Sequence, residues 1–127
     1  MTIVGHGIDV VEVARIKAKM ESPSKKWAEK VYSDEERAQA DAPPTDARYF
    51  AGRFAGKEAV AKALGTGFSG KVTWNGIEIL RQPNGAPGVR LSGGALELAQ
   101  SLGVTEWVIS ISHCGELAVA SVIALSD

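Results

Sequence analysis

The sequence of 127 residues contains a single cysteine, Cys114. One cysteine excludes a disulfide framework within the chain and a metal site built from several cysteine ligands. The most apolar stretch, Leu117 to Leu125, is far shorter than the roughly 20 residues that a helix needs to span a bilayer. The first residues, MTIVGHG, lack the basic segment of a signal peptide. We therefore expect no membrane association and a cytoplasmic location.

The chain also lacks a net charge that would direct it to a polyanion. Its formal net charge is −1 at pH 7, which argues against bulk attraction to nucleic acid. The composition, with 45% hydrophobic and 23% charged residues, is that of a globular protein. Because this length is typical of one domain, we predict a single domain over residues 1–127.

The first third of the chain has signals for one strand and several short helices. β-Branched residues over 2–11 favour a strand. Val13, Ile16 and Met20 then recur at the spacing of a short amphipathic helix, with Arg15 and Lys19 on its outer side. The residues SDEE at 33–36 form a capping box, which begins a further helix.

The remainder of the chain predicts a long helix followed by strands. Thr45 or Asp46 can cap the long helix, which ends at Gly65. Two hairpins with a helix between them are then expected: strands at 71–82 and 88–93, a helix at 94–102, and strands at 106–112 and 116–125. This order favours an α+β fold in which the long helix packs on a mostly antiparallel sheet.

The long helix is rich in small residues. Alanine recurs at every fourth position from Ala47 to Ala63, and Gly52 and Gly56 lie among them. Glycine within a helix costs roughly 0.5–1 kcal/mol relative to alanine, so its presence needs a reason. We expect that the small residues let the helix approach its neighbours closely. The long charged side chains would then border a narrow cleft: Arg53, Lys57, Glu58 and Lys62.

Two carboxylates are candidates for a metal site. Glu58 lies among cations, which suits a magnesium ion that bridges to phosphate, although the same spacing is typical of surface ion pairs on an inert helix. Asp9 lies within a strand and by alternation shares a face with Ile3, Gly5, Gly7 and Val11. A buried carboxylate there needs donors, a cation or a metal. The alternative is that Asp9 turns to solvent or caps the helix that follows.

Other polar signals have a structural and a functional interpretation. The loop GTGFSG at 65–70 matches a phosphate-binding pattern, but a helix enters it and a strand leaves it, so a glycine-rich helix cap is favoured. A third alternative is that the loop passes close to a ligand for reasons unrelated to that pattern. His113 ends a strand on the face of Trp107 and Ile111, where a hydrogen-bonded structural role competes with a ligand role. Cys114 next to it does not by itself make a nucleophile–base pair.

Three segments resemble the signature motifs of the phosphopantetheinyl transferases, in particular the short, stand-alone holo-acyl-carrier-protein synthases. They are GIDVVEVARI at 7–16, RFAGKEAVAKALGTG at 53–67 and ISISHCGELAVASVIA at 109–124. The resemblance implies a magnesium-dependent transfer of 4′-phosphopantetheine from coenzyme A to a serine of apo-acyl carrier protein. Adenosine 3′,5′-bisphosphate would be the second product. It also implies a homotrimer with active sites between subunits.

The resemblance assigns roles to individual residues. Asp9 and Glu58 correspond to the magnesium ligands, and Glu58 is also our candidate for the general base. Lys62 corresponds to the lysine at the pyrophosphate, where it would act in catalysis, and His113 to the histidine near the nucleotide. Gly65 is a further expected contact with coenzyme A, and Arg53 and Lys57 are weaker candidates for contacts with its phosphates.

The same resemblance implies a function for the excess of basic residues in the first helical region. Residues 15–30 carry six lysines and arginines against two glutamates. Because acyl carrier proteins are acidic, Arg15 and Lys19 are expected to bind the partner, whereas the alternative is a solubilising surface. Two other functions stay open at this point: a non-catalytic carrier-binding or nucleotide-binding module, and a different magnesium-dependent phosphotransferase.

Overall fold

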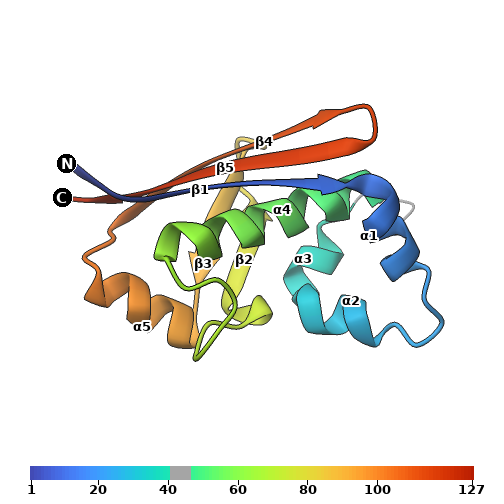
Figure 1. The fold of residues 1–127 in the computed structure, drawn as a ribbon, viewed down its shortest axis with the longest axis horizontal. Coiled ribbons are helices and arrows are strands. Elements are labelled where there is room, and N and C mark those ends of the chain that lie inside the picture. The colour runs from blue at the N-terminus through green and yellow to red at the C-terminus, as the bar shows by residue number, and fades with distance from the viewer. Residues whose placement is uncertain (41–46) are drawn as a thin grey trace.

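The computed structural model describes residues 1–40 and 47–127. Three antiparallel strands form the main sheet in the order β1 (Thr2–Glu12), β5 (Leu117–Ser126) and β4 (Glu106–Cys114). β4 and β5 are joined by a tight turn in which Gly115 has a φ of 55°. Both chain ends lie together at one end of this sheet (Figure 1). The predicted second hairpin is therefore confirmed, with a turn shorter than expected because β4 continues through His113 and Cys114.

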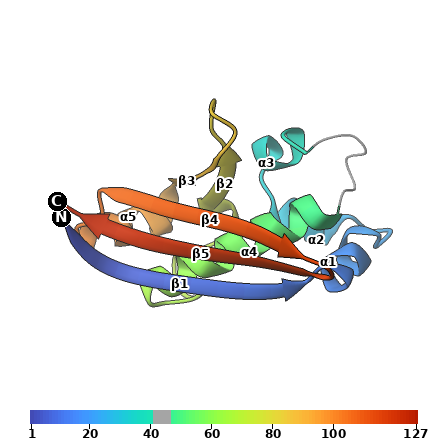
Figure 2. The same ribbon diagram turned by 90° about the horizontal axis from the view of Figure 1, so that it is seen from above.

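Helix α4 (Ala47–Leu64) lies along one face of the main sheet, as Figures 1 and 2 show. Four alanine or valine side chains of β5 are buried beneath it: Ala118, Ala120, Val122 and Ala124. The helix ends where expected, since Gly65 follows it with a φ of 85°. The predicted caps Thr45 and Asp46 lie outside the described residues. The expected α+β fold with a long helix on an antiparallel sheet is confirmed.

Glycines allow this helix and its neighbours to approach closely. A Cβ atom added to Gly5 or Gly7 of β1 would lie 2.0 or 1.9 Å from the carbonyl oxygen of Ala63 or Ala59. On the helix itself, Gly52 and Gly56 face side chains of β4 and β2. The backbones of β1 and α4 are thus in direct contact, which confirms the close approach expected from the small residues.

Three short helices follow β1 and cover the end of α4 at which it begins. They are α1 (Val13–Met20), α2 (Lys26–Val31) and α3 (Asp34–Ala38). Val13 and Ile16 of α1 are buried, as the apolar spacing predicted. The capping box of α3 is also confirmed: Ser33 Oγ accepts from the amide of Glu36, and the Glu36 carboxylate accepts from the amide of Ser33.

The segment after α4 differs from the expected strand over 71–82. A 3₁₀ turn, η1 (Trp74–Gly76), comes first, and β2 (Ile77–Arg81) then pairs with β3 (Pro87–Leu91) in a separate two-stranded sheet. Helix α5 (Gly93–Ser101) follows, close to its predicted bounds. The two predicted hairpins therefore lie in different sheets, and the β2–β3 pair lies beside β4 of the main sheet.

The outer face of the main sheet bears no covering element in the described part of the chain. It carries apolar side chains with large exposed fractions, among them Ile8 at 53% and Val10 at 55%. A bulge between Ile3 and Gly5 shifts the pairing of β1 with β5, so Ile3 also lies on this face and is 65% exposed. The prediction that Ile3 shares the inner face with Asp9 is therefore wrong, because alternation does not continue through a bulge.

None of the helices formed by the described residues is both long and apolar enough to cross a bilayer.

Candidate active site between strand β1 and helix α4

Asp9 and Lys62 meet where β1 passes over the last turns of α4. Asp9 lies on the inner face of β1, and its side chain is only 16% exposed. The ammonium of Lys62 donates to Asp9 Oδ1 at 3.0 Å and to the carbonyl of Ile8 at 2.9 Å. Because half of the Lys62 side chain is exposed, this ion pair lies at an edge that solvent and ligands can reach.

Glu58 lies one helical turn before Lys62 on the same face of α4. Burial raises the pKa of the Glu58 carboxyl, and the nearby negative charge of Asp9 raises it further. The positive charges of Lys62 and Arg15 act in the opposite direction. The structure thus brings Asp9, Glu58 and Lys62 together, with two carboxylates of like charge at one site.

This juxtaposition depends on the backbone contact described above. Gly7 precedes Asp9 by two residues on the inner face of β1, and its partner Ala59 is next to Glu58. Any side chain at Gly7 would separate strand and helix, and with them the two carboxylates. The glycines of β1 are therefore part of how the site is built.

The donor set fits a magnesium ion with few protein ligands. Within residues 1–40 and 47–127, no group of three or more histidine, cysteine, aspartate or glutamate side chains could hold a metal. Magnesium is commonly bound by one or two carboxylates, with water and substrate phosphate oxygens as the other ligands. Asp9 and Glu58 provide that donor set. A bound cation would offset the burial and the nearby negative charge that raise the pKa of Glu58.

Helix α1 borders the same site. The guanidinium of Arg15 lies 5.5 Å from the ring centre of Phe54, which precedes Glu58 by one turn of α4. Arg15 is exposed and close enough to Glu58 to affect its pKa. Lys19 lies one turn further along α1 and is also exposed. The predicted basic surface of α1 is therefore adjacent to the carboxylates.

Gly65 ends α4 just after Lys62. Its amide donates to the carbonyl of Lys62 at 3.0 Å, and the amide of Gly67 donates to the carbonyl of Ala61 at 3.3 Å. These bonds cap the C-terminus of the helix, as the favoured interpretation of the GTGFSG loop expected. Apart from its neighbours in the chain, no atom of the described residues lies within 4 Å of where a Gly65 Cβ would be, so a ligand can approach the backbone there.

Arg53 lies on another face of α4, about 180° around the helix from Lys62. Its guanidinium stacks 4.4 Å from the ring centre of Tyr49, and its buried Nε atom has no hydrogen-bond partner among the described residues. Burial lowers the pKa of Arg53. Within one chain the structure does not bring Arg53 to the carboxylates.

His113 is also apart from Asp9. Its Nε2 atom lies 2.8 Å from the carbonyl oxygen of Arg48 in the first turn of α4, and its ring packs against Gly52. Asp9 and His113 are on the same face of the main sheet, but β5 separates their strands. His113 therefore has the hydrogen bond of a structural histidine within the single chain.

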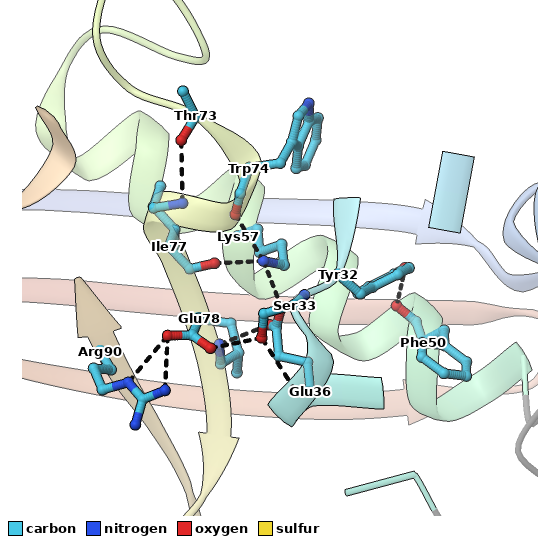
Figure 3. A network of polar contacts seen from close by, with 12 residues as sticks. Tyr32, Ser33, Glu36, Phe50, Lys57, Thr73, Trp74, Ile77, Glu78 and Arg90 are labelled. Atoms are coloured by element: carbon cyan, nitrogen blue, oxygen red, sulfur yellow. Dashed lines mark hydrogen bonds and ion pairs between the residues drawn. The ribbon is translucent and has the colours of Figure 1, made fainter. Parts of the chain in front are cut away.

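Lys57 does not border the cleft, so the prediction that it contacts phosphate is wrong. Its side chain is fully buried, and its ammonium pairs with the buried carboxylate of Glu36 at 2.7 Å (Figure 3). Burial lowers the pKa of Lys57 and raises that of Glu36. Spacing along the helix identified neither this ion pair nor the aromatic residue Trp74, whose carbonyl accepts from Lys57 at 2.8 Å.

Comparison with known proteins gives consistent matches over nearly the whole chain. A family model described as the 4′-phosphopantetheinyl transferase superfamily matches residues 5–120. A holo-[acyl-carrier-protein] synthase of Natranaerobius thermophilus is 46% identical over 125 residues, which covers 98% of this chain and 99% of the relative. A protein of the same name from Desulfovibrio desulfuricans is 47% identical over 121 residues, 95% of this chain and 96% of the relative.

Solved structures of similar proteins share the fold. The holo-[acyl-carrier-protein] synthase of Neisseria meningitidis superposes with a TM-score of 0.85 at 32% identity, covering 98% of this chain and all of the other. That of Helicobacter pylori, solved in complex with coenzyme A, has a TM-score of 0.83 at 31% identity, covering 94% and 99%.

Proposed function

This chain belongs to the 4′-phosphopantetheinyl transferase superfamily, and we propose that it transfers 4′-phosphopantetheine from coenzyme A to a serine of an apo-acyl carrier protein. The observation that carries this proposal is the gathering of Asp9, Glu58 and Lys62 at one accessible edge between β1 and α4. The names of the relatives and the coenzyme A complex of the H. pylori protein support the substrate assignment.

We infer that Asp9 and Glu58 hold Mg²⁺ in this reaction. When bound, the ion would bind diphosphate oxygens of coenzyme A and stabilise the negative charge that develops during transfer. Lys62 already pairs with Asp9, so its ammonium is close enough to bind a phosphate oxygen that approaches the same carboxylate. The backbone at Gly65, which no side chain covers, leaves room for that phosphate.

The transfer itself needs positioning and charge neutralisation more than covalent help from the protein. The serine oxygen of the carrier protein forms a bond to the phosphorus that bears pantetheine. The bond from that phosphorus to the bridging oxygen breaks, and adenosine 3′,5′-bisphosphate leaves. Lys62 neutralises the leaving phosphate. Glu58, beside the metal site, is our candidate to accept the serine proton.

We further propose that the protein forms a homotrimer with active sites between subunits, and that Arg53 and His113 contribute to these sites. Both residues lie apart from Asp9 within one chain, and a neighbouring subunit could supply them to the same coenzyme A molecule. The exposed apolar outer face of the main sheet supports such an assembly, because apolar patches of this kind are typical of protein interfaces. Arg15 and Lys19 of α1 would bind the acidic carrier protein beside the site.

The proposal is tested by mass spectrometry of a carrier protein purified in its apo form. Incubation with this protein, coenzyme A and Mg²⁺ should add one phosphopantetheine group to the carrier and release adenosine 3′,5′-bisphosphate. EDTA should abolish the product, and Glu58→Gln should greatly slow its formation.

Carrier binding without an adduct would instead identify a non-catalytic module. Phosphoryl transfer that ignores coenzyme A would identify a different phosphotransferase. Near-normal turnover of Glu58→Gln at saturating Mg²⁺ would remove Glu58 as the base.

A further inference from the structure

The ammonium of Lys57 is bound on all sides inside the protein. Its three protons have three acceptors: Glu36 Oε1 at 2.7 Å, the carbonyl of Trp74 at 2.8 Å and the carbonyl of Ile77 (Figure 3). Glu36 is held in turn, because its carboxylate accepts from the amides of Ser33 and Ile79. Lys57 therefore connects α4 to α3 and to both ends of the η1 turn.

Stability alone does not account for this arrangement. Burying an ion pair is commonly no better for stability than a well-packed apolar pair of the same volume. What an ammonium provides, and an apolar side chain cannot, is a fixed direction for each carbonyl that it binds. The two carbonyls bound by Lys57 belong to Trp74 and Ile77, which bracket η1. The ion pair thus determines where η1 lies against α4.

The indole of Trp74 connects η1 to residues next to the candidate active site. One of its faces stacks on Phe54, with ring centres 5.2 Å apart and an interplanar angle of 25°. Phe68 also stacks on Trp74, with ring centres 3.7 Å apart and an angle of 17°. Phe54 lies one turn before Glu58, and Phe68 belongs to residues 65–70, which directly follow the helix that carries Lys62.

Residues 65–70, here called the glycine loop, depend on that stacking for their position. Gly65, Gly67 and Gly70 all have positive φ angles, and in the described part of the chain only their sequence neighbours come within 4 Å of where their Cβ atoms would be. The hydroxyl of Ser69 donates to the carbonyl of Thr66, within the loop itself. Phe68 is half-buried and packs against the core. The amides of Gly65 and Gly67 tie the start of the loop to the end of α4, and the ring of Phe68 on Trp74 connects its middle to η1.

We propose that Lys57, held by Glu36, is a positioning residue for coenzyme A binding. It fixes η1, and the Trp74–Phe68 stack then holds the glycine loop where the diphosphate binds next to Lys62. This inference rests on the proposed function. It predicts that Lys57 and Trp74 affect the affinity for coenzyme A through the same chain of contacts, although neither residue touches the two carboxylates of the site.

The test measures coenzyme A affinity by calorimetry with Mg²⁺ present, together with steady-state kinetics for both substrates. Trp74→Ala, which leaves no charge unpaired, should weaken coenzyme A binding about tenfold or more while the KM for carrier protein stays unchanged. Trp74→Phe keeps a ring between Phe54 and Phe68 and should restore most of the affinity. Lys57→Met should show a similar loss, and combining it with Trp74→Ala should add little further.

Arg90→Gln is the matched control at the other end of the same polar network. The Arg90 guanidinium bonds to the buried carboxylate of Glu78 and to the exposed carboxylate of Glu35, at the opposite end of the network from Trp74 (Figure 3). This variant should lower the melting temperature without changing coenzyme A affinity. Folded Lys57→Met and Trp74→Ala proteins that bind coenzyme A normally would overturn the inference. So would equal losses for both substrates, or a fall in kcat alone. Failure of the unaltered protein to bind coenzyme A would overturn the proposed function and this inference together.

Discussion

Replacing Gly7 by alanine tests how the candidate site is assembled. The added Cβ would lie 1.9 Å from the carbonyl oxygen of Ala59, whereas real Cβ atoms essentially never approach closer than 3.0 Å. Because this oxygen belongs to the backbone of α4, it cannot rotate away. Strand and helix must separate locally by about 1 Å. Asp9 and Glu58 are each within two residues of this contact, so the separation acts directly on the distance between the carboxylates.

The expected effects differ in size between stability and activity. Overpacking of this kind costs about 1–3 kcal/mol of unfolding free energy, which would lower the melting temperature by several degrees. A misplacement of about 1 Å at a catalytic site can cost on the order of 100-fold in activity. Gly7→Ala should therefore still be folded at the temperature of the assay. Its kcat/KM should fall by about two orders of magnitude, and it should bind Mg²⁺ more weakly. Thermal unfolding and phosphopantetheine transfer at several Mg²⁺ concentrations measure both effects.

Gly56→Ala is the matched control on the other side of the contact. Its Cβ would meet the side chains of Ile79 and Ile109 at 3.1 and 3.3 Å, and these can shift. Alanine is also about 0.5–1 kcal/mol better than glycine within a helix. This variant should keep its activity and its melting temperature. If Gly7→Ala behaved like Gly56→Ala in stability, turnover and Mg²⁺ affinity, the close approach of β1 would not be what forms the site.

Three further predictions concern charge and assembly. Because the folded state raises the pKa of Glu58, the stability linked to its protonation is complete below its unfolded value of 4.5 and is lost as the pH rises through the raised value. Glu58→Gln should therefore raise the melting temperature in EDTA at about pH 8 and give no gain at about pH 4, as scanning calorimetry can measure. Arg15→Glu should raise the KM for carrier protein in a salt-dependent way and leave coenzyme A affinity unchanged. Val10→Asp, on the outer face of the main sheet, should convert the proposed trimer to monomers in analytical ultracentrifugation.

Local sequence signals predicted the elements of this fold well. The capping box at 33–36 and the glycine after Leu64 each act within a few residues, so the ends of α3 and α4 could be read from neighbouring positions. The bulge between Ile3 and Gly5 could not, because it is defined by the pairing of β1 with β5, more than 100 residues away. The same holds for the division into two sheets, which depends on which strands find each other after folding.

The candidate site also has one part that the sequence predicted and one part that it did not. The spacing of Glu58 and Lys62 put them on one helix face, and Asp9 came to them because glycine on β1 and alanine on α4 favoured close packing. The hydrogen-bond partners of Glu36 could not be predicted from the sequence. A glutamate in a capping box is ordinarily an exposed residue, and nothing near it in sequence indicates that its second oxygen accepts from Ile79.

Helix α4 shows why periodicity alone could not separate its cations. Arg53, Lys57 and Lys62 are equally plausible phosphate contacts by spacing, yet Lys57 is fully buried while half of the Lys62 side chain is exposed. Periodicity assigns each residue to a face, but the return of α3 and η1 across α4 decides which faces are covered. A lysine on a covered face must find a carboxylate, and Glu36 meets that need. The buried pair and the exposed pair thus have the same chemistry, one holding the scaffold and the other available to a ligand.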